Sequence, residues 1–142
     1  KITSGMMGGS WMGSHFTNDD LVKHSRMSRD YTIKLTSQDD KVYRFTLQAK
    51  PDAPVVWDKL KVTVRRPDLQ PLRQEYYDED GRKGRVMIFS EHKKIGGRVV
   101  PQKMTMRPTD KPGELTELTL ERIDFDVELS REFFSLQRLK SL

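Results

Sequence analysis

The sequence predicts a mainly β protein built around one curved antiparallel sheet of about seven strands. From residue 28 onward, apolar and polar residues alternate with a period of two, which is typical of half-buried strands. Turns rich in glycine, proline and aspartate separate the alternating segments. None of these segments is followed by the helical crossover of roughly 10–15 residues that joins parallel strands. The three observations together indicate an antiparallel meander with one apolar face.

A short helix is expected before the strands. Thr17 is followed by two acids, Asp19 and Asp20. This is a typical helix start, because a threonine hydroxyl accepts a hydrogen bond from the amide three residues on and acids favour the positive end of the helix dipole. We therefore predict one short helix near residues 18–25. A metal or acid–base site made by these acids with His15 is the alternative, but adjacent carboxylates point apart on a helix.

The first two predicted strands form a hairpin, with a Ser-Gln-Asp-Asp turn at residues 37–40. Their apolar side chains alternate with lysine, arginine, glutamine and threonine and therefore share one face. The apolar set is Tyr31, Ile33 and Leu35 in the first strand and Tyr43, Phe45 and Leu47 in the second. We expect these six side chains to line the concave face of the sheet.

The rest of the chain continues the meander. Two strands are predicted at residues 57–66 and 69–78, and the glycines at 81 and at 96–97 supply the positive backbone angles of tight hairpins. After a turn at residues 110–113, a last long strand is predicted at residues 115–129, with a bulge near residue 121 where the alternation shifts. Phe133 and Phe134 then form a short turn that we expect to pack under the sheet.

The loop at residues 5–14 combines four glycines with apolar side chains. Its apolar residues are Met6, Met7, Trp11 and Met12. Two interpretations fit: a fixed plug whose side chains fill the core, or an adaptable rim around a cavity, for which flexible methionine is well suited. The loop is our candidate for the rim of a cavity.

Composition excludes several classes of function. The chain has 142 residues, enough for one domain with a core of its own, and no cysteine, which removes disulfides, thiolate metal sites and cysteine nucleophiles. The formal net charge is +5, but the basic excess is spread along the chain, so we expect no nucleic-acid partner. Contact with an anionic membrane surface stays open as an interpretation of this charge.

Catalytic motifs are absent from the sequence. It contains no Gly-x-Ser-x-Gly, no His-Glu-x-x-His and no phosphate-binding loop. The histidines, at positions 15, 24 and 92, lie in no metal-ligand spacing. We therefore predict no catalytic residues, no metal, no cofactor and no enzymatic activity.

A family resemblance is carried mainly by the two ends of the chain. The run from Gly9 to Leu21, Gly-Ser-Trp-Met-Gly-Ser-His-Phe-Thr-Asn-Asp-Asp-Leu, resembles the Gly-Ser-x-Phe-Thr-x-Asp-Asp-Leu segment of bacterial outer-membrane lipoprotein-sorting proteins, which are similar to the periplasmic lipoprotein carriers LolA and LolB. Further similar segments follow in order: Tyr-Tyr-Asp-Glu-Asp-Gly at residues 76–81, Gly-Arg-Val-Val-Pro at 97–101, Asp-Lys-Pro-Gly at 110–113, and Phe-Asp-Val at 125–127 with Phe-Phe-Ser-Leu at 133–136.

The resemblance implies a half-open, LolA-like barrel whose apolar concave face takes acyl chains of a lipid or lipoprotein. It implies a periplasmic protein, made as a precursor with a signal peptide, that acts in outer-membrane lipoprotein sorting; the alternative is a lipid- or protein-sensing module of the same fold that transports nothing. Lipid-binding candidates are the six hairpin residues named above together with Met104 and Met106.

The resemblance also bears on how the apolar face is covered. Family members carry further strands and a helix before the Gly-Ser-x-Phe-Thr segment, to which nothing in residues 1–142 corresponds. We therefore expect a single domain over residues 1–142 that lacks an N-terminal portion of the family fold. Such a sheet exposes an edge or an apolar face, and either a homodimer or the N-terminal segment would complete it.

Overall fold

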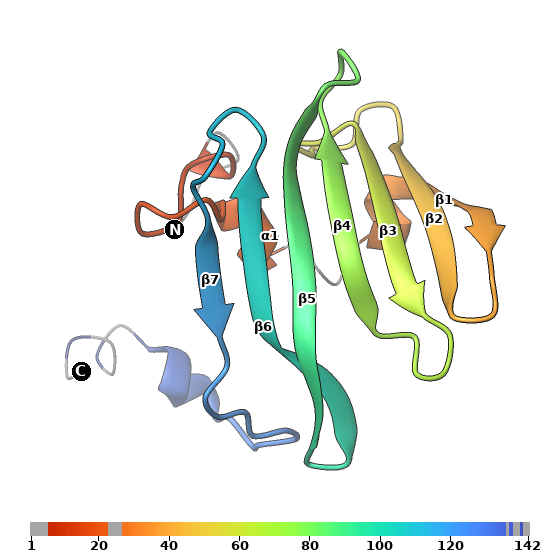
Figure 1. Cartoon of the computed structure of the whole chain (residues 1–142). Coiled ribbons are helices and arrows are strands. Elements are labelled where there is room, and N and C mark those ends of the chain that lie inside the picture. The colour runs from red at the N-terminus through yellow and green to blue at the C-terminus, as the bar shows by residue number, and fades with distance from the viewer. Residues whose placement is uncertain (1–5, 23–26, 136, 138–139, 141–142) are drawn as a thin grey trace.

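A computed structural model describes residues 6–22, 27–135, 137 and 140, and its main feature is one open seven-stranded antiparallel sheet (Figure 1). The strands lie in chain order from one edge of the sheet to the other. They are β1 (Tyr31–Gln38), β2 (Val42–Ala49), β3 (Lys59–Arg65), β4 (Pro71–Tyr77), β5 (Lys83–Ile95), β6 (Arg98–Pro108) and β7 (Thr116–Thr119). The mainly β, antiparallel and unclosed architecture that the alternation predicts is confirmed.

The helices of the described chain are short. α1 (Asn18–Val22) and α2 (Met27–Asp30) precede β1, and a 3-10 helix, η2 (Arg131–Phe134), lies near the C-terminus. The expected helix near residues 18–25 is confirmed over α1, whereas residues 23–26 lie outside the described part of the chain. α2 is not predicted by the sequence, because residues 28–30 fall in the segment whose alternation predicts a strand.

The cap of α1 is the reverse of the expected one. The carboxylate of Asp20 accepts hydrogen bonds from the amide of Thr17 at 2.7 Å and from its hydroxyl at 2.9 Å. The amide of Asp20 donates to the backbone carbonyl of Thr17. The third helical side chain therefore reaches back to the cap residue, which is one half of a capping box.

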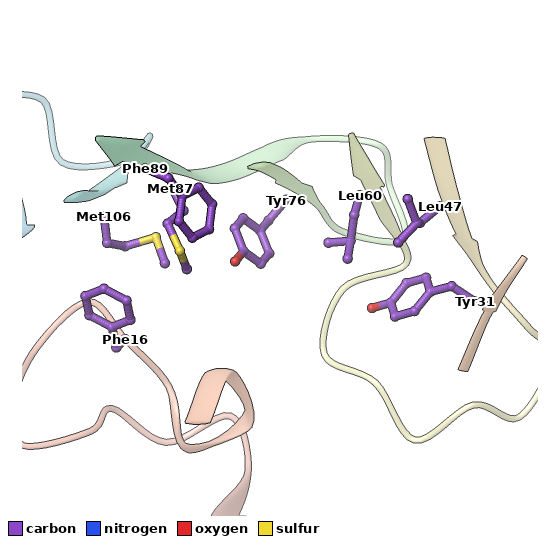
Figure 2. Packing of buried hydrophobic residues seen from close by; sticks show 8 residues of the cluster. All are labelled: Phe16, Tyr31, Leu47, Leu60, Tyr76, Met87, Phe89 and Met106. Carbon is purple, nitrogen blue, oxygen red and sulfur yellow. The ribbon is translucent and has the colours of Figure 1, made fainter. Parts of the chain in front are cut away.

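One face of the sheet is mainly apolar, because the register places apolar residues opposite one another, with Gln74 and Arg85 buried among them. Leu47 pairs with Leu60, Leu60 with Tyr76, and Met87 with Met106. The strands arch over these side chains, and Phe16 of the N-terminal segment approaches them from the other side (Figure 2). The buried core consists of Phe16, Tyr31, Leu47, Leu60, Tyr76, Met87, Phe89 and Met106.

The C-terminal part of the sheet is shorter than predicted. β7 ends at Thr119, so the long strand expected at residues 115–129 is wrong beyond that point. Of the apolar residues expected in that strand, Phe125 lies against Gly96 of the β5–β6 hairpin and stacks with the Arg98 guanidinium at 4.7 Å, whereas Val127 and Leu129 are exposed. The expected packing of Phe133 and Phe134 under the sheet is also wrong, since these side chains are exposed. They contact each other, with ring centroids 5.3 Å apart.

Candidate functional site

The apolar face of the sheet has a covered half and an open half. Trp11 and Phe16 of the N-terminal segment, Met27 of α2, and Val55 and Trp57 of the β2–β3 connection pack over the covered half. Figure 1 shows the N-terminal segment and both helices on one side of the sheet. The other end of β1 and β2 has no such cover in the described residues. This uncovered surface is the strongest candidate for a binding site, because monomeric proteins seldom expose contiguous apolar surface without a function.

The open half is centred on β1. Ile33 is 48% exposed and Leu35 is 45% exposed. The register places Ile33 opposite Leu47 and Leu35 opposite Phe45, so both side chains point to the same face as the core. Phe45 in turn pairs with Val62 of β3. We call Ile33, Leu35, Phe45 and Val62 the open apolar strip.

The remaining hairpin candidates extend from this strip into the core. Tyr43 is half-buried, with its ring centroid 6.2 Å from that of Phe45 and the Arg66 guanidinium 4.9 Å above its ring. Leu47 is buried in the core, and so is Tyr31, whose hydroxyl donates to the backbone carbonyl of Trp57 at 2.8 Å. The six predicted positions therefore share one face, but two of them belong to the covered half.

The two methionine candidates lie far from the open strip. Met106 is fully buried, at 0% exposure, and faces Phe16 (Figure 2). Met104 is half-buried, packs against the same core and pairs with Phe89 and Leu118 across the neighbouring strands. Both belong to the covered half of the sheet, several strands away from β1.

The candidate rim loop is partly anchored. Trp11 packs on the core, and its amide donates to the carbonyl of Phe16 at 2.8 Å. Met7 is half-buried, whereas Met6 is 55% exposed and Met12 is 86% exposed. The loop thus combines one fixed aromatic anchor with two methionines that project into solvent.

A buried ion pair, which the sequence did not reveal, joins the N-terminal segment to the sheet. The Arg85 guanidinium on β5 donates to the Asp20 carboxylate at 2.6 Å, and the two side chains are only 6% and 10% exposed. Arg85 also donates to the carbonyl of His15 at 3.1 Å and stacks over the rings of Tyr76 at 4.3 Å and Trp57 at 5.0 Å. An arginine in an alternating strand gives no sign of which distant acid it meets.

A small cavity of about 40 Å³ lies beside this ion pair. Burial, and then the charge of Asp20, raise the pKa of the Tyr76 hydroxyl far above its ordinary value, so this hydroxyl stays neutral. The cavity is too small for an acyl chain and mixes polar with apolar walls. It is lined by Asp19, Asp20, Met27, Asp30, Tyr31, Val55, Trp57, Leu60, Gln74 and Tyr76.

His15 is held away from the two acids of α1. Its Nδ1 lies 2.8 Å from the hydroxyl of Thr116, and its Nε2 lies 3.1 Å from the carboxylate of Glu114. These contacts position the segment before β7. Among the described residues, no group of three histidine, aspartate or glutamate side chains is arranged to hold a metal ion.

Charged side chains are concentrated on the other face of the sheet. From β1 to β6 each strand places at least one lysine or arginine on this face, alongside threonines and, on β5, Val86 and Ile88. In the described part of the chain, no helix is long and apolar enough to cross a bilayer. The sheet therefore separates an apolar concave face from a basic outer face.

Comparison with solved structures shows the fold. The chain is similar to a DUF1329 family protein from Desulfovibrio piger, with a TM-score of 0.88, 23% identity and 97% of this chain covered. It is similar to a candidate outer membrane lipoprotein-sorting protein domain from Vibrio parahaemolyticus, with a TM-score of 0.84, 23% identity and 98% of this chain covered. A LolA superfamily protein from Nitrosomonas europaea gives a TM-score of 0.75 at 20% identity and 93% coverage of this chain. The chain spans 58% to 60% of the length of these three structures.

Comparison of sequences identifies the family to which the chain belongs. No curated protein matches the chain. Over residues 1–141 it matches a family described as "Uncharacterized protein". The resemblance to lipoprotein-sorting proteins seen in the sequence is confirmed at the level of the fold. The chain therefore belongs to the family that it matches over residues 1–141, and its fold is that of the LolA superfamily and lipoprotein-sorting structures.

Proposed function

We propose that this protein is a periplasmic carrier that holds the acyl chains of a lipid or lipidated protein against the open apolar strip, in the service of outer-membrane lipoprotein sorting. The observation that carries the proposal is the exposure of Ile33 and Leu35, at 48% and 45%, on a face whose other half is a packed core. The names of the two lipoprotein-sorting and LolA structures support the same class of cargo.

Hydrophobic burial is sufficient to hold such a cargo. Each methylene removed from water contributes about 0.8 kcal/mol, so ten methylenes laid along the strip contribute about 8 kcal/mol before the entropic cost of binding. Phe45 and Val62 extend the strip from β1 to β3, which gives the chain a surface continuous with the core. Binding of this kind needs no charged group at the strip and is readily reversible.

The proposal is tested by uptake of a fluorescent fatty acid and by native mass spectrometry of the protein purified from a bacterial host. We expect co-purified lipid and saturable uptake. Ile33→Asp should weaken uptake about tenfold or more, because a carboxylate beside a buried acyl chain must be desolvated.

The matched control is Thr32→Asp, which places the same charge on the neighbouring exposed residue of β1, facing the other side of the sheet. This variant should bind the fatty acid like the wild type. Equal uptake by wild type and Ile33→Asp, with both proteins folded by circular dichroism, contradicts the proposed site.

Delivery of the bound lipid to an acceptor distinguishes a carrier from a sensing module. A carrier passes its bound fatty acid to acceptor vesicles at a rate that depends on acceptor concentration, whereas a sensing module keeps it. Transfer followed by fluorescence dequenching therefore decides between the carrier and a module of the same fold that only detects the lipid.

A further inference from the structure

The outer face of the sheet carries more cations than carboxylates. Residues that alternate with the core positions of β1 to β6 point to this face. Its cations include Lys34, Arg44, Lys59, Lys61, Arg73, Lys83, Lys103 and Arg107, and the carboxylates beside them are Glu75, Glu117 and Asp39, which pairs with Arg44 at 2.8 Å. We call this set the basic face.

Cations outnumber carboxylates on the basic face. The eight cations named exceed the three carboxylates beside them, and the full sequence has a net charge of +5. The sequence shows these residues as scattered single cations. The fold brings them together because strands of alternating pattern lie side by side in one register.

The carboxylate of Glu75 does not neutralise the face but organises its cations. It accepts hydrogen bonds from Arg73 at 2.9 Å, from Lys83 at 3.1 Å and from the hydroxyl of Tyr77 at 3.0 Å. Burial raises the pKa of Glu75, but the three donors together outweigh it and hold the pKa at about 2. Glu75 is therefore ionised at neutral pH, and its carboxylate holds Arg73 and Lys83 close together.

Tyr77 is the aromatic residue of this face within the described strands, and it is already occupied. The ammonium groups of Lys59 and Lys61 lie 4.9 Å and 5.3 Å from its ring centroid, and that of Lys83 lies 5.9 Å away. Its ring is thus not free for the base stacking by which proteins bind single-stranded nucleic acid. The three lysines, on the other hand, are held close together, where they reinforce one another's attraction for anions.

An open hollow of about 430 Å³ lies on the β1–β4 part of the sheet. Arg44, Lys61 and Arg73 supply cations to its wall, and threonine and serine hydroxyls supply further hydrogen-bond donors. Such a combination matches the phosphate oxygens of a lipid headgroup. The complete lining is Thr36, Ser37, Arg44, Phe45, Thr46, Lys61, Val62, Thr63, Arg73 and Glu75.

We propose that the basic face docks the protein on a membrane surface that carries anionic phospholipid headgroups. Charge complementarity selects this partner: the cations extend over six strands as a broad array, with the headgroup-sized hollow within it. Each lysine or arginine near an anionic bilayer strengthens binding about fivefold. Phe45 and Val62 of the open apolar strip also line the hollow, but Ile33 and Leu35, on which cargo binding is tested, lie on the face of β1 opposite to Lys34, so the two proposals can be tested separately.

The test is co-sedimentation with vesicles of phosphatidylcholine alone and with vesicles of equal parts phosphatidylcholine and phosphatidylglycerol. We expect binding to the anionic vesicles only, and we expect added salt to weaken it steeply, because salt screens exposed charges. Lys34→Glu combined with Lys61→Glu should weaken binding about 20-fold or more. Both lysines are exposed, and thermal melting checks that the double variant is folded.

The matched control is Lys93→Glu combined with Lys111→Glu, which changes the net charge equally at exposed positions outside the basic face. If this control still binds the anionic vesicles, the result supports docking through the basic face. If both double variants lose binding equally, net charge alone explains the binding and the proposal is overturned. Binding that is equally strong to phosphatidylcholine vesicles overturns electrostatic docking, as does tighter binding to duplex DNA than to the anionic vesicles. Ile33→Asp should bind vesicles normally, which separates this result from the test of the carrier function.

Discussion

Arg85 and Asp20 form an ion pair in the covered half of the sheet. It joins α1 to β5, and the arginine is also held between the rings of Tyr76 and Trp57. Removing one partner of a buried pair leaves the other charge in a poorly solvated place, which is far more costly than losing a surface pair. This ion pair therefore adds to the apolar contacts of Phe16 and Trp11 in holding the N-terminal segment on the core.

Arg85→Met should lower the free energy of unfolding by about 3–5 kcal/mol, because Asp20 stays buried without its cation. The measurement is urea denaturation followed by tryptophan fluorescence. The control is Arg98→Met, whose pair with Asp126 is 55% and 77% exposed and whose loss should cost less than about 1 kcal/mol. Similar losses of unfolding free energy in the two variants would mean that the buried ion pair stabilises the protein no more than the exposed one.

Glu75 gives the stability of the protein an acid dependence. Its pKa is about 2 in the folded protein, compared with an ordinary value of 4.5. A lowered pKa means that the unfolded chain takes up the proton first. The stabilisation from Glu75 is therefore complete above about pH 4.5 and is lost as the pH falls towards 2.

Glu75→Gln should flatten the fall in stability over this acid range, since the variant has no carboxyl group to protonate at that position. Urea denaturation at a series of acid pH values measures the effect. If wild type and variant lose stability in parallel between pH 4.5 and 2, the three hydrogen bonds to Glu75 do not lower its pKa in solution.

At the scale of single elements, the mobility of the loop at residues 6–14 can be tested directly. Its backbone is tied to the following residues: the Trp11 amide donates to the Phe16 carbonyl, and the Ser14 amide to the Trp11 carbonyl. Met12 is 86% exposed between these anchors. A rim that moves would therefore pivot about Trp11 and carry Met12 and Gly13 with it.

Hydrogen exchange tests this behaviour of the loop. Without ligand, we expect slow exchange at the Trp11 amide, which has a backbone partner, and fast exchange at Met12 and Gly13. Added fatty acid should slow exchange at Met12 and Gly13 if the loop is the rim of the binding face. Unchanged exchange on saturation with fatty acid would make the loop a structural cap of the covered half.

At the scale of the whole molecule, the strands were predictable and the contacts between distant segments were not. Alternation indicated the hairpin of β1 and β2 and the common face of Ile33, Leu35 and Phe45, because the side-chain period of a strand is local. It failed at residues 120–129, where Phe125 packs on the β5–β6 hairpin and Val127 and Leu129 are exposed. A linear pattern does not show whether an apolar residue meets a sheet or a single neighbouring side chain.

The candidate site shows the same limit. The sequence located the apolar face, but it placed Met106 in the binding set although this residue is 0% exposed in the core. It also gave no indication that Arg85 meets Asp20 or that scattered lysines gather on one face. These properties depend on which strands are neighbours and on what covers them, and both are set by packing over the whole chain.

The two faces of the sheet are encoded by alternate residues of the same strands, and this constrains how the chain can change in length. One residue inserted near the start of β2 or β3 would turn every later side chain of that strand to the opposite side and bring Arg44 or Lys61 into the core. Insertions and deletions should therefore be tolerated at the hairpin turns, such as residues 78–82, and eliminated from the strands. Relatives that differ freely in side chains should still keep the length of these strands.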